Sequence, residues 1–146
     1  MTRLRRQAAA DDTGSVTVLM LFLTISMMIT AGIVIDGGRA MAGRQRAANT
    51  AEQAARLGAD QLDLAAMRSG ARTPLNTAAA RADAIAFVNA SGSNMTGTVT
   101  ITGDTVSVHV THTMPTSLLG LIGITSFTQS ARSEARPVRG VTSEGP

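Results

Sequence analysis

The 146-residue sequence predicts an α+β protein, in which a long N-terminal helix, first apolar and then amphipathic, is followed by a second helix and a small antiparallel sheet. Three observations predict this fold class. Residues 15–35 form an uncharged stretch long enough to cross a membrane, and an Ala-rich stretch with helical periodicity follows it. Residues 98–111 then alternate between aliphatic and mostly hydroxyl-bearing side chains, as strands with one buried face do.

The uncharged stretch runs from Ser15 to Ile35. As a helix it would cover roughly 31 Å, close to the hydrocarbon thickness of a bilayer. Two other interpretations are a buried helix of a soluble protein, for which this chain offers too small a core, and a cleaved signal sequence. The small-residue site Ala40-Met41-Ala42 would fit such cleavage, but Asp36 and Arg39 separate it from the apolar stretch. We expect a retained single-pass anchor, with the lipid bilayer as a partner.

Composition excludes several classes of function. The chain has no cysteine, which rules out a disulfide scaffold, a Cys-ligated zinc site and a thiol nucleophile. The net charge is only +3, and three residues are aromatic. A protein that binds nucleic acid usually has a dense basic face or stacking aromatic side chains, so we do not expect nucleic acid as a partner.

Similar numbers of arginines flank the span on its two sides, so charge does not decide its orientation.

Residues 40–68 are predicted to form an amphipathic helix that continues from the span, with the glycines at 37, 38 and 43 as the expected bend and Ser69-Gly70 as its end. A ridge of small residues runs along this helix, which allows another element to approach closely. That element could belong to the same domain or to another copy or partner. The ridge residues are Gly43, Ala47, Ala51, Ala55 and Ala59.

The second helix is predicted to begin at Thr73-Pro74, with threonine as N-cap and proline at the first helical position, and to end at residues 91–94. Its expected buried face is Leu75, Ala78, Ala82, Ile85 and Ala86.

Residues 98–102 and 105–111 predict a hairpin closed by Gly103-Asp104. Residues 117–124 read as a short apolar helix or loop, and residues 127–135 as a third strand. We therefore expect a cytoplasmic or external arm at 1–14, the span at 15–35, an α+β domain at 36–136 and a disordered tail at 137–146.

The sequence contains no pattern typical of catalysis. It has neither a G-x-G-x-x-G turn nor a P-loop with its lysine, because the chain has no lysine. His109 and His112 are the two histidines, and on one strand they would point to opposite faces, so joint metal ligation is not expected and both are predicted to face solvent or a sheet edge. No paired carboxylates stand out. We expect no catalytic, cofactor or metal site.

The N-terminal part of the sequence resembles the N-terminal module of TadE/TadG-like proteins, pseudopilin-like components of the tight-adherence (Flp) pilus assembly system. The resemblance rests on a glycine before the span (Gly14, followed by Ser15), an aspartate that closes it (Asp36), a Gly-Arg pair (Gly38-Arg39) and an Ala-rich helix after it. It covers about the first 60 residues.

The resemblance implies a pilin-like, membrane-anchored subunit with a cytoplasmic N-terminus, an extracytoplasmic C-terminal domain and other pilus-assembly or pilin-like subunits as partners. TadE-type members are cut after a glycine that a glutamate follows five residues later. Here Gly14 would be that glycine, and Leu19 stands at the glutamate position. Asp36 is interpreted either as an interfacial carboxylate that pairs locally with Arg39 or as a docking contact for another assembly protein.

Three hypotheses of function follow from these observations. The first is a non-enzymatic minor pilin-like or assembly protein of a Tad/Flp-type system. The second is an anchored extracytoplasmic module that binds a ligand or wall polymer through its Thr-rich sheet. The third, an enzyme, would require a pocket with converging polar groups.

Overall fold

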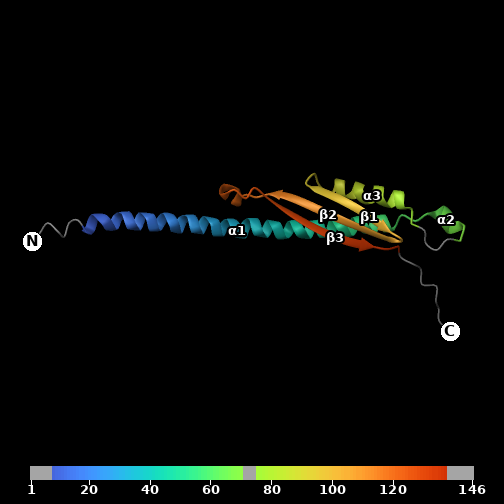
Figure 1. Ribbon diagram of the computed structural model, residues 1–146, viewed down its shortest axis with the longest axis horizontal. Coiled ribbons are helices and arrows are strands. Elements are labelled where there is room, and N and C mark those ends of the chain that lie inside the picture. Colours follow the sequence, from blue (N-terminus) through green and yellow to red (C-terminus); the bar gives the residue numbers. More distant parts are fainter. Residues whose placement is uncertain (1–7, 71–74, 138–146) are drawn as a thin grey trace, which may run out of the picture. The chain divides into compact units, whose positions relative to one another are not determined.

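The computed structural model describes residues 8–70 and 75–137. These residues fall into two compact units. The first contains the chain up to Arg39 together with residues 116–125, and the second contains residues 40–115 and the chain from Ser126 onward. Helix α1 (Ala8–Ala59) contributes to both units, and each unit is described by itself below (Figure 1).

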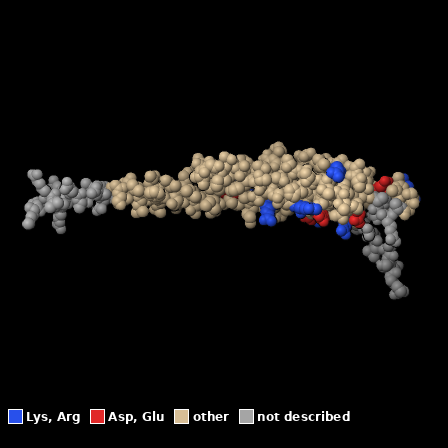
Figure 2. Space-filling view, viewed as in Figure 1, with Lys and Arg blue, Asp and Glu red and all other residues tan. Residues whose placement is uncertain are grey.

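The apolar part of α1 dominates the first unit. Among the described residues, one helix is long and apolar enough to cross a membrane, with a mean hydropathy of 2.5 over its most apolar 18-residue window. Only 6% of that window is buried, so the apolar side chains face outward. On the face drawn in Figure 2, this segment presents a surface without charged side chains. Length, composition and exposure thus agree with the predicted single-pass anchor.

The second part of the first unit is residues 116–125, which connect strands β2 (Thr105–Pro115) and β3 (Ser126–Ala135) and are called the β2–β3 loop below. A single 3-10 helix, η1 (Leu119–Ile122), lies within it. The loop ends its helical turn at Gly123, whose φ of 93° is the left-handed conformation that glycine adopts without strain. The sequence predicted either a short helix or a loop for residues 117–124, and the structure has a short helix within a loop.

The sheet of the second unit has three antiparallel strands in the order β1-β2-β3. They are β1 (Met95–Thr102), β2 (Thr105–Pro115) and β3 (Ser126–Ala135). Thr102 pairs with Thr105, and Gly103 between them has a φ of 61°, so the predicted two-residue hairpin is confirmed. Strand β3 is confirmed as well. Together with the long helix, these strands confirm the predicted α+β class.

The Ala-rich helix ends earlier than the sequence predicted. Helix α1 stops at Ala59, and a separate helix, α2 (Leu64–Arg68), follows. The side chain of Asp63 causes the restart, because it accepts the backbone N–H groups of Ala65 and Ala66, each at 3.0 Å, and so caps a new helix. The prediction of one helix over residues 40–68 was therefore wrong, although Ser69 does end α2.

Helix α3 (Thr77–Ala90) is the predicted second helix, but its start and its buried face differ from the prediction. Its N-cap is Asn76, whose side chain accepts the N–H of Ala79 at 3.1 Å, and the predicted start at Thr73-Pro74 lies outside the described residues. Its buried residues are Ala80, Ala84 and Val88. Five other residues were predicted to be buried. Of these, Leu75 and Ile85 are half-buried, and Ala78, Ala82 and Ala86 are exposed.

The core of the second unit is built from small helix residues against aliphatic strand residues. Figure 1 shows α3 running beside β1. A Cβ on Gly97 of β1 would lie 2.9 Å from Val88 of α3, so helix and strand are in close contact there. The buried apolar residues are Ala47, Ala51, Ala54, Ala55, Ala59, Ala80, Ala84, Val88, Met95, Val99, Val106, Val108 and Val110.

Candidate functional site

The candidate site is the contact between Asp36 and the β2–β3 loop, both in the first unit. Asp36 is the first charged residue after the uncharged stretch, yet only 1% of its surface is exposed. A buried carboxylate requires hydrogen-bond donors around it, because desolvation of an unpaired charge is strongly unfavourable. These donors come from a segment about 80 residues further along the chain.

Three consecutive backbone N–H groups supply them. Ser117 donates to Oδ1 of Asp36, and Leu118 and Leu119 donate to Oδ2, all at 2.9 Å. These groups lie at the start of η1, where N–H groups have no partner inside the helix. The local N-cap residue, Leu118, has no side chain able to accept them. Asp36 thus acts as the cap of a helix that is distant in sequence.

The same contact sets the protonation state of Asp36, which lies just outside the uncharged stretch. Its pKa is lowered from the usual 3.8, mainly by the N–H of Leu119 and then by those of Ser117 and Leu118, with a smaller effect of the nearby Arg39 guanidinium. Burial acts in the opposite direction and is outweighed. Asp36 is therefore an ionised hydrogen-bond acceptor at neutral pH.

Arg39 completes the polar contact from the next turn of α1. Its guanidinium donates to the hydroxyl of Ser117. The ion pairs Arg56–Glu52 and Arg132–Glu134 lie elsewhere, in the second unit. Arg39 therefore reaches the loop through Ser117, and its charge acts on Asp36 without a direct ion pair.

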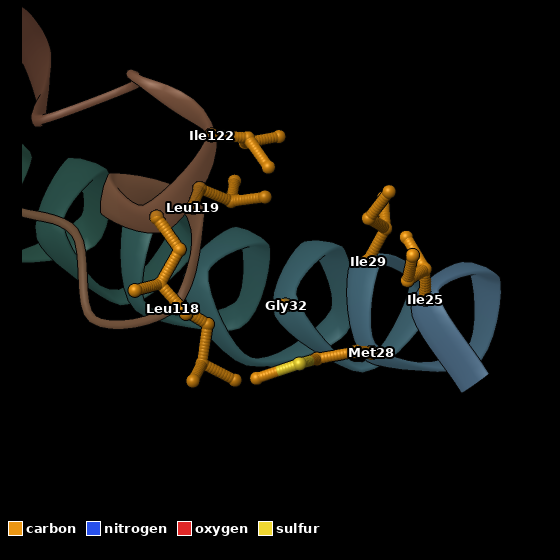
Figure 3. Close-up of a pocket in the computed structure, with 8 residues that line it drawn as sticks. Ile25, Met28, Ile29, Gly32, Leu118, Leu119 and Ile122 are labelled. Atoms are coloured by element: carbon orange, nitrogen blue, oxygen red, sulfur yellow. The ribbon is translucent and has the colours of Figure 1, made fainter. Parts of the chain in front are cut away.

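One turn earlier on α1, Gly32 makes an apolar contact with the same loop. A Cβ at Gly32 would lie 3.3 Å from both Leu118 and Leu119, which is closer than ordinary packing. The absence of a side chain thus lets the side chains of Leu118 and Leu119 come close to the helix. Beyond this contact, the loop and α1 enclose an apolar groove, shown in Figure 3. It is lined by Ile25, Met28, Ile29, Gly32, Leu118, Leu119, Leu121 and Ile122.

The other residues singled out by sequence lie elsewhere. Gly14 and Ser15 are exposed on α1, and Gly38 is exposed one residue before Arg39 with nothing within 4 Å of a Cβ placed on it. The ridge residues Gly43, Ala47, Ala51, Ala55 and Ala59 are all buried, and they belong to the second unit.

The surroundings of Gly43 explain its burial. A Cβ there would meet the sulfur of Met114 and would lie 3.3 Å from Nδ1 of His112, so this end of the ridge packs on the chain's own sheet.

The two histidines differ from each other. His109 is exposed, as expected, but His112 is only 7% exposed, so its prediction as a solvent-facing or edge residue was wrong. It lies on the strand face that packs against the small residues of α1. Within the described part of the chain, no group of three His, Cys, Asp or Glu residues is placed to hold a metal ion.

Sequence reasoning identified Asp36 and Arg39. It missed Gly32, and it missed the β2–β3 loop that Asp36 and Arg39 bind. A signal was present, because residues 116–125, which connect β2 and β3, contain five leucine or isoleucine residues and no charged residue.

Comparison with known proteins supports the sequence-based interpretation. Residues 14–61 match a family model described as putative Flp pilus-assembly TadE/G-like. No curated protein matches the chain, and no solved structure does. The matched segment contains Gly14, Asp36, Gly38 and Arg39, and it supports a role related to Tad pilus assembly.

Proposed function

We propose that this protein is a non-enzymatic, membrane-anchored component of a Tad/Flp-type pilus or secretion system, either a minor pilin-like subunit or an assembly protein. One observation carries the proposal: the TadE/G-like match spans the apolar helix, the Asp36 motif and the Ala-rich helix as one continuous segment, residues 14–61. In this proposal, residues 1–14 are cytoplasmic, residues 15–35 cross the bilayer and residues 36–136 are extracytoplasmic.

The structure offers a physical basis for a docking role. The exposed surface of the apolar helix gives lateral partners a lipid-embedded face, as van der Waals packing between spans requires. The partners in this proposal are other pilus-assembly or pilin-like subunits.

Genetic deletion tests the function. We expect a strain without the gene to lose or reduce surface pili or the associated secretion, and the wild-type gene to restore them. The Asp83→Asn variant, which changes an exposed acidic residue of α3, is the matched control and should restore them equally. Normal pilus assembly and secretion in the deletion strain would contradict the proposal. Recovery of the protein with a bound wall polymer, without pilus components, would favour the anchored binding module instead.

Topology and processing can be tested separately, because the chain contains no cysteine. A cysteine at Ser93, which is exposed in the second unit, should react with a membrane-impermeant maleimide in whole cells, whereas one at Ala9 should react only after lysis. Mass spectrometry of the mature N-terminus then decides cleavage. A start at Ser15 would support pseudopilin processing, an intact N-terminus would favour a TadG-like protein, and a start near Gly43 would contradict the anchor.

A further inference from the structure

The β2–β3 loop carries large apolar side chains that are exposed. Leu121 is 72% exposed, Ile122 54% and Ile124 42%, and the loop contains no charged residue. Exposed apolar groups that cluster on a short loop commonly mark a contact with another apolar phase or partner. The position of the loop along α1 indicates which of these it contacts.

The loop lies beside the apolar stretch of α1 rather than beyond its end. Leu118 and Leu119 contact the position of Gly32, and Leu121 and Ile122 line one groove with Ile25 and Ile29. In Figure 3, Leu119 and Ile122 project from the loop toward the turns of the helix that carry Ile25 and Ile29. At a helical rise of about 1.5 Å per residue, Gly32 lies about 6 Å and Ile29 about 10 Å before Asp36. A bilayer that covers this stretch would also cover the loop.

The backbone of the loop is suited to such a position. Irregular backbone is unfavourable in hydrocarbon unless its polar groups are satisfied within the protein. Asp36 accepts three N–H groups at the entry of the loop. Thr116 donates its N–H to the carbonyl of Thr125 across the base of the loop. Within the loop, the N–H groups of Leu121, Gly123 and Ile124 donate to the carbonyls of Leu118, Gly120 and Leu119.

We infer that the β2–β3 loop is a second membrane-inserting element, which dips into the leaflet beside the span with Leu121 and Ile122 in contact with lipid acyl chains. The inference rests on the membrane-anchored part of the proposed function. Lipid is favoured because the exposed apolar surface of the loop continues onto that of α1, where Ile25 is 47% and Met28 53% exposed. Asp36 and Arg39 then mark the depth at which the chain leaves the hydrocarbon.

Fluorescence quenching in vesicles tests this inference. The full-length protein carries single cysteines at Leu121 or Ile122, labelled with the environment-sensitive dye NBD and reconstituted into phosphatidylcholine vesicles. Both positions are exposed, so neither substitution removes a buried contact, and the two variants check each other. Leu21→Cys on the apolar stretch is the membrane control, and Thr100→Cys on an exposed face of β1 is the aqueous control.

We expect NBD at position 121 or 122 to lose emission with acyl-brominated lipids, as at position 21, and to keep its emission with iodide, which should quench position 100. Iodide quenching without bromolipid quenching at the loop would overturn the inference. Protection from both quenchers would also overturn it, because it would mean that a second copy or another protein covers the loop. If position 21 also fails to respond to bromolipids, the anchor itself is wrong. A response at 21 but not at the loop refutes only the present inference.

Discussion

The carboxylate of Asp36 accepts the backbone N–H of Leu119 at 2.9 Å, although 83 positions separate the two residues in the chain. Asp36 ends the uncharged stretch of α1, and Leu119 begins the one helical turn of the β2–β3 loop. The aspartate of the TadE/G-like segment thus has a structural role in this chain, since it fixes a loop that lies outside the matched residues 14–61.

Replacement of Asp36 by asparagine should release the loop. An amide offers one acceptor oxygen and turns an NH₂ group toward N–H donors, so at least one of the three hydrogen bonds is replaced by a repulsive contact. We expect the amides of Ser117, Leu118 and Leu119 to exchange about tenfold faster or more in detergent-solubilised protein, measured by hydrogen-exchange mass spectrometry. Amides of the sheet should not change. Asp83→Asn is the control, and unchanged loop protection in Asp36→Asn would show that the carboxylate does not hold the loop.

Acidification should release the same loop in the wild-type protein. The pKa of Asp36 is lowered on folding from 3.8, so its ionised form stabilises the folded contact above this value. This stability is fully present from neutral pH down to the unfolded pKa and is lost as the pH falls through the lower folded pKa. NMR titration of the Leu119 amide should therefore show a transition below pH 3.8, absent from Asp36→Asn. A transition above 3.8 would mean that burial outweighs the three N–H groups.

The sequence was sufficient for those features that depend on local pattern. The span follows from an uninterrupted run without charge, and the hairpin from alternation around Gly103-Asp104. The donors to Asp36 could not be predicted, because backbone N–H groups are common to all residues and only the tertiary fold brings those of Ser117–Leu119 to the carboxylate. Sequence therefore identified the two charged residues of the candidate site, Asp36 and Arg39, but not Gly32 or the loop.

Alanine-rich segments explain most of the remaining errors. In α3, alanines occupy both the buried positions, such as Ala80 and Ala84, and the exposed positions, such as Ala78 and Ala82. Hydrophobic periodicity cannot distinguish faces that carry the same side chain. His112 was misplaced for a related reason, because a polar residue on the packed face of a strand is accommodated only where the opposing helix residue is as small as Gly43.

Two glycines of α1 should respond oppositely to replacement by alanine. A Cβ on Gly58 would lie 3.0 Å from Val106 and 3.1 Å from the backbone oxygen of Ala80, which cannot rotate away, whereas Gly38 has open space around it. We expect Gly58→Ala to lower the free energy of unfolding by about 1–3 kcal/mol through overpacking. Gly38→Ala should not lower it, and should raise it by up to about 1 kcal/mol through helix propensity. Urea denaturation in micelles, followed by circular dichroism, measures both, and equal effects would contradict the described packing of α1 in the second unit.

The contact between α3 and β1 should show energetic coupling between Gly97 and Val88. A Cβ on Gly97 would lie 2.9 Å from one methyl of Val88 and 3.2 Å from its Cβ, so no rotation of the valine removes the overlap. Gly97→Ala alone should destabilise the protein by about 1–3 kcal/mol, and Val88→Ala alone by a similar amount because it leaves a cavity. In the double variant the new methyl group occupies part of that cavity, so the combined loss should be smaller than the sum by about 1 kcal/mol. Additive losses in the same denaturation experiment would show that the helix and the strand do not meet at these two residues.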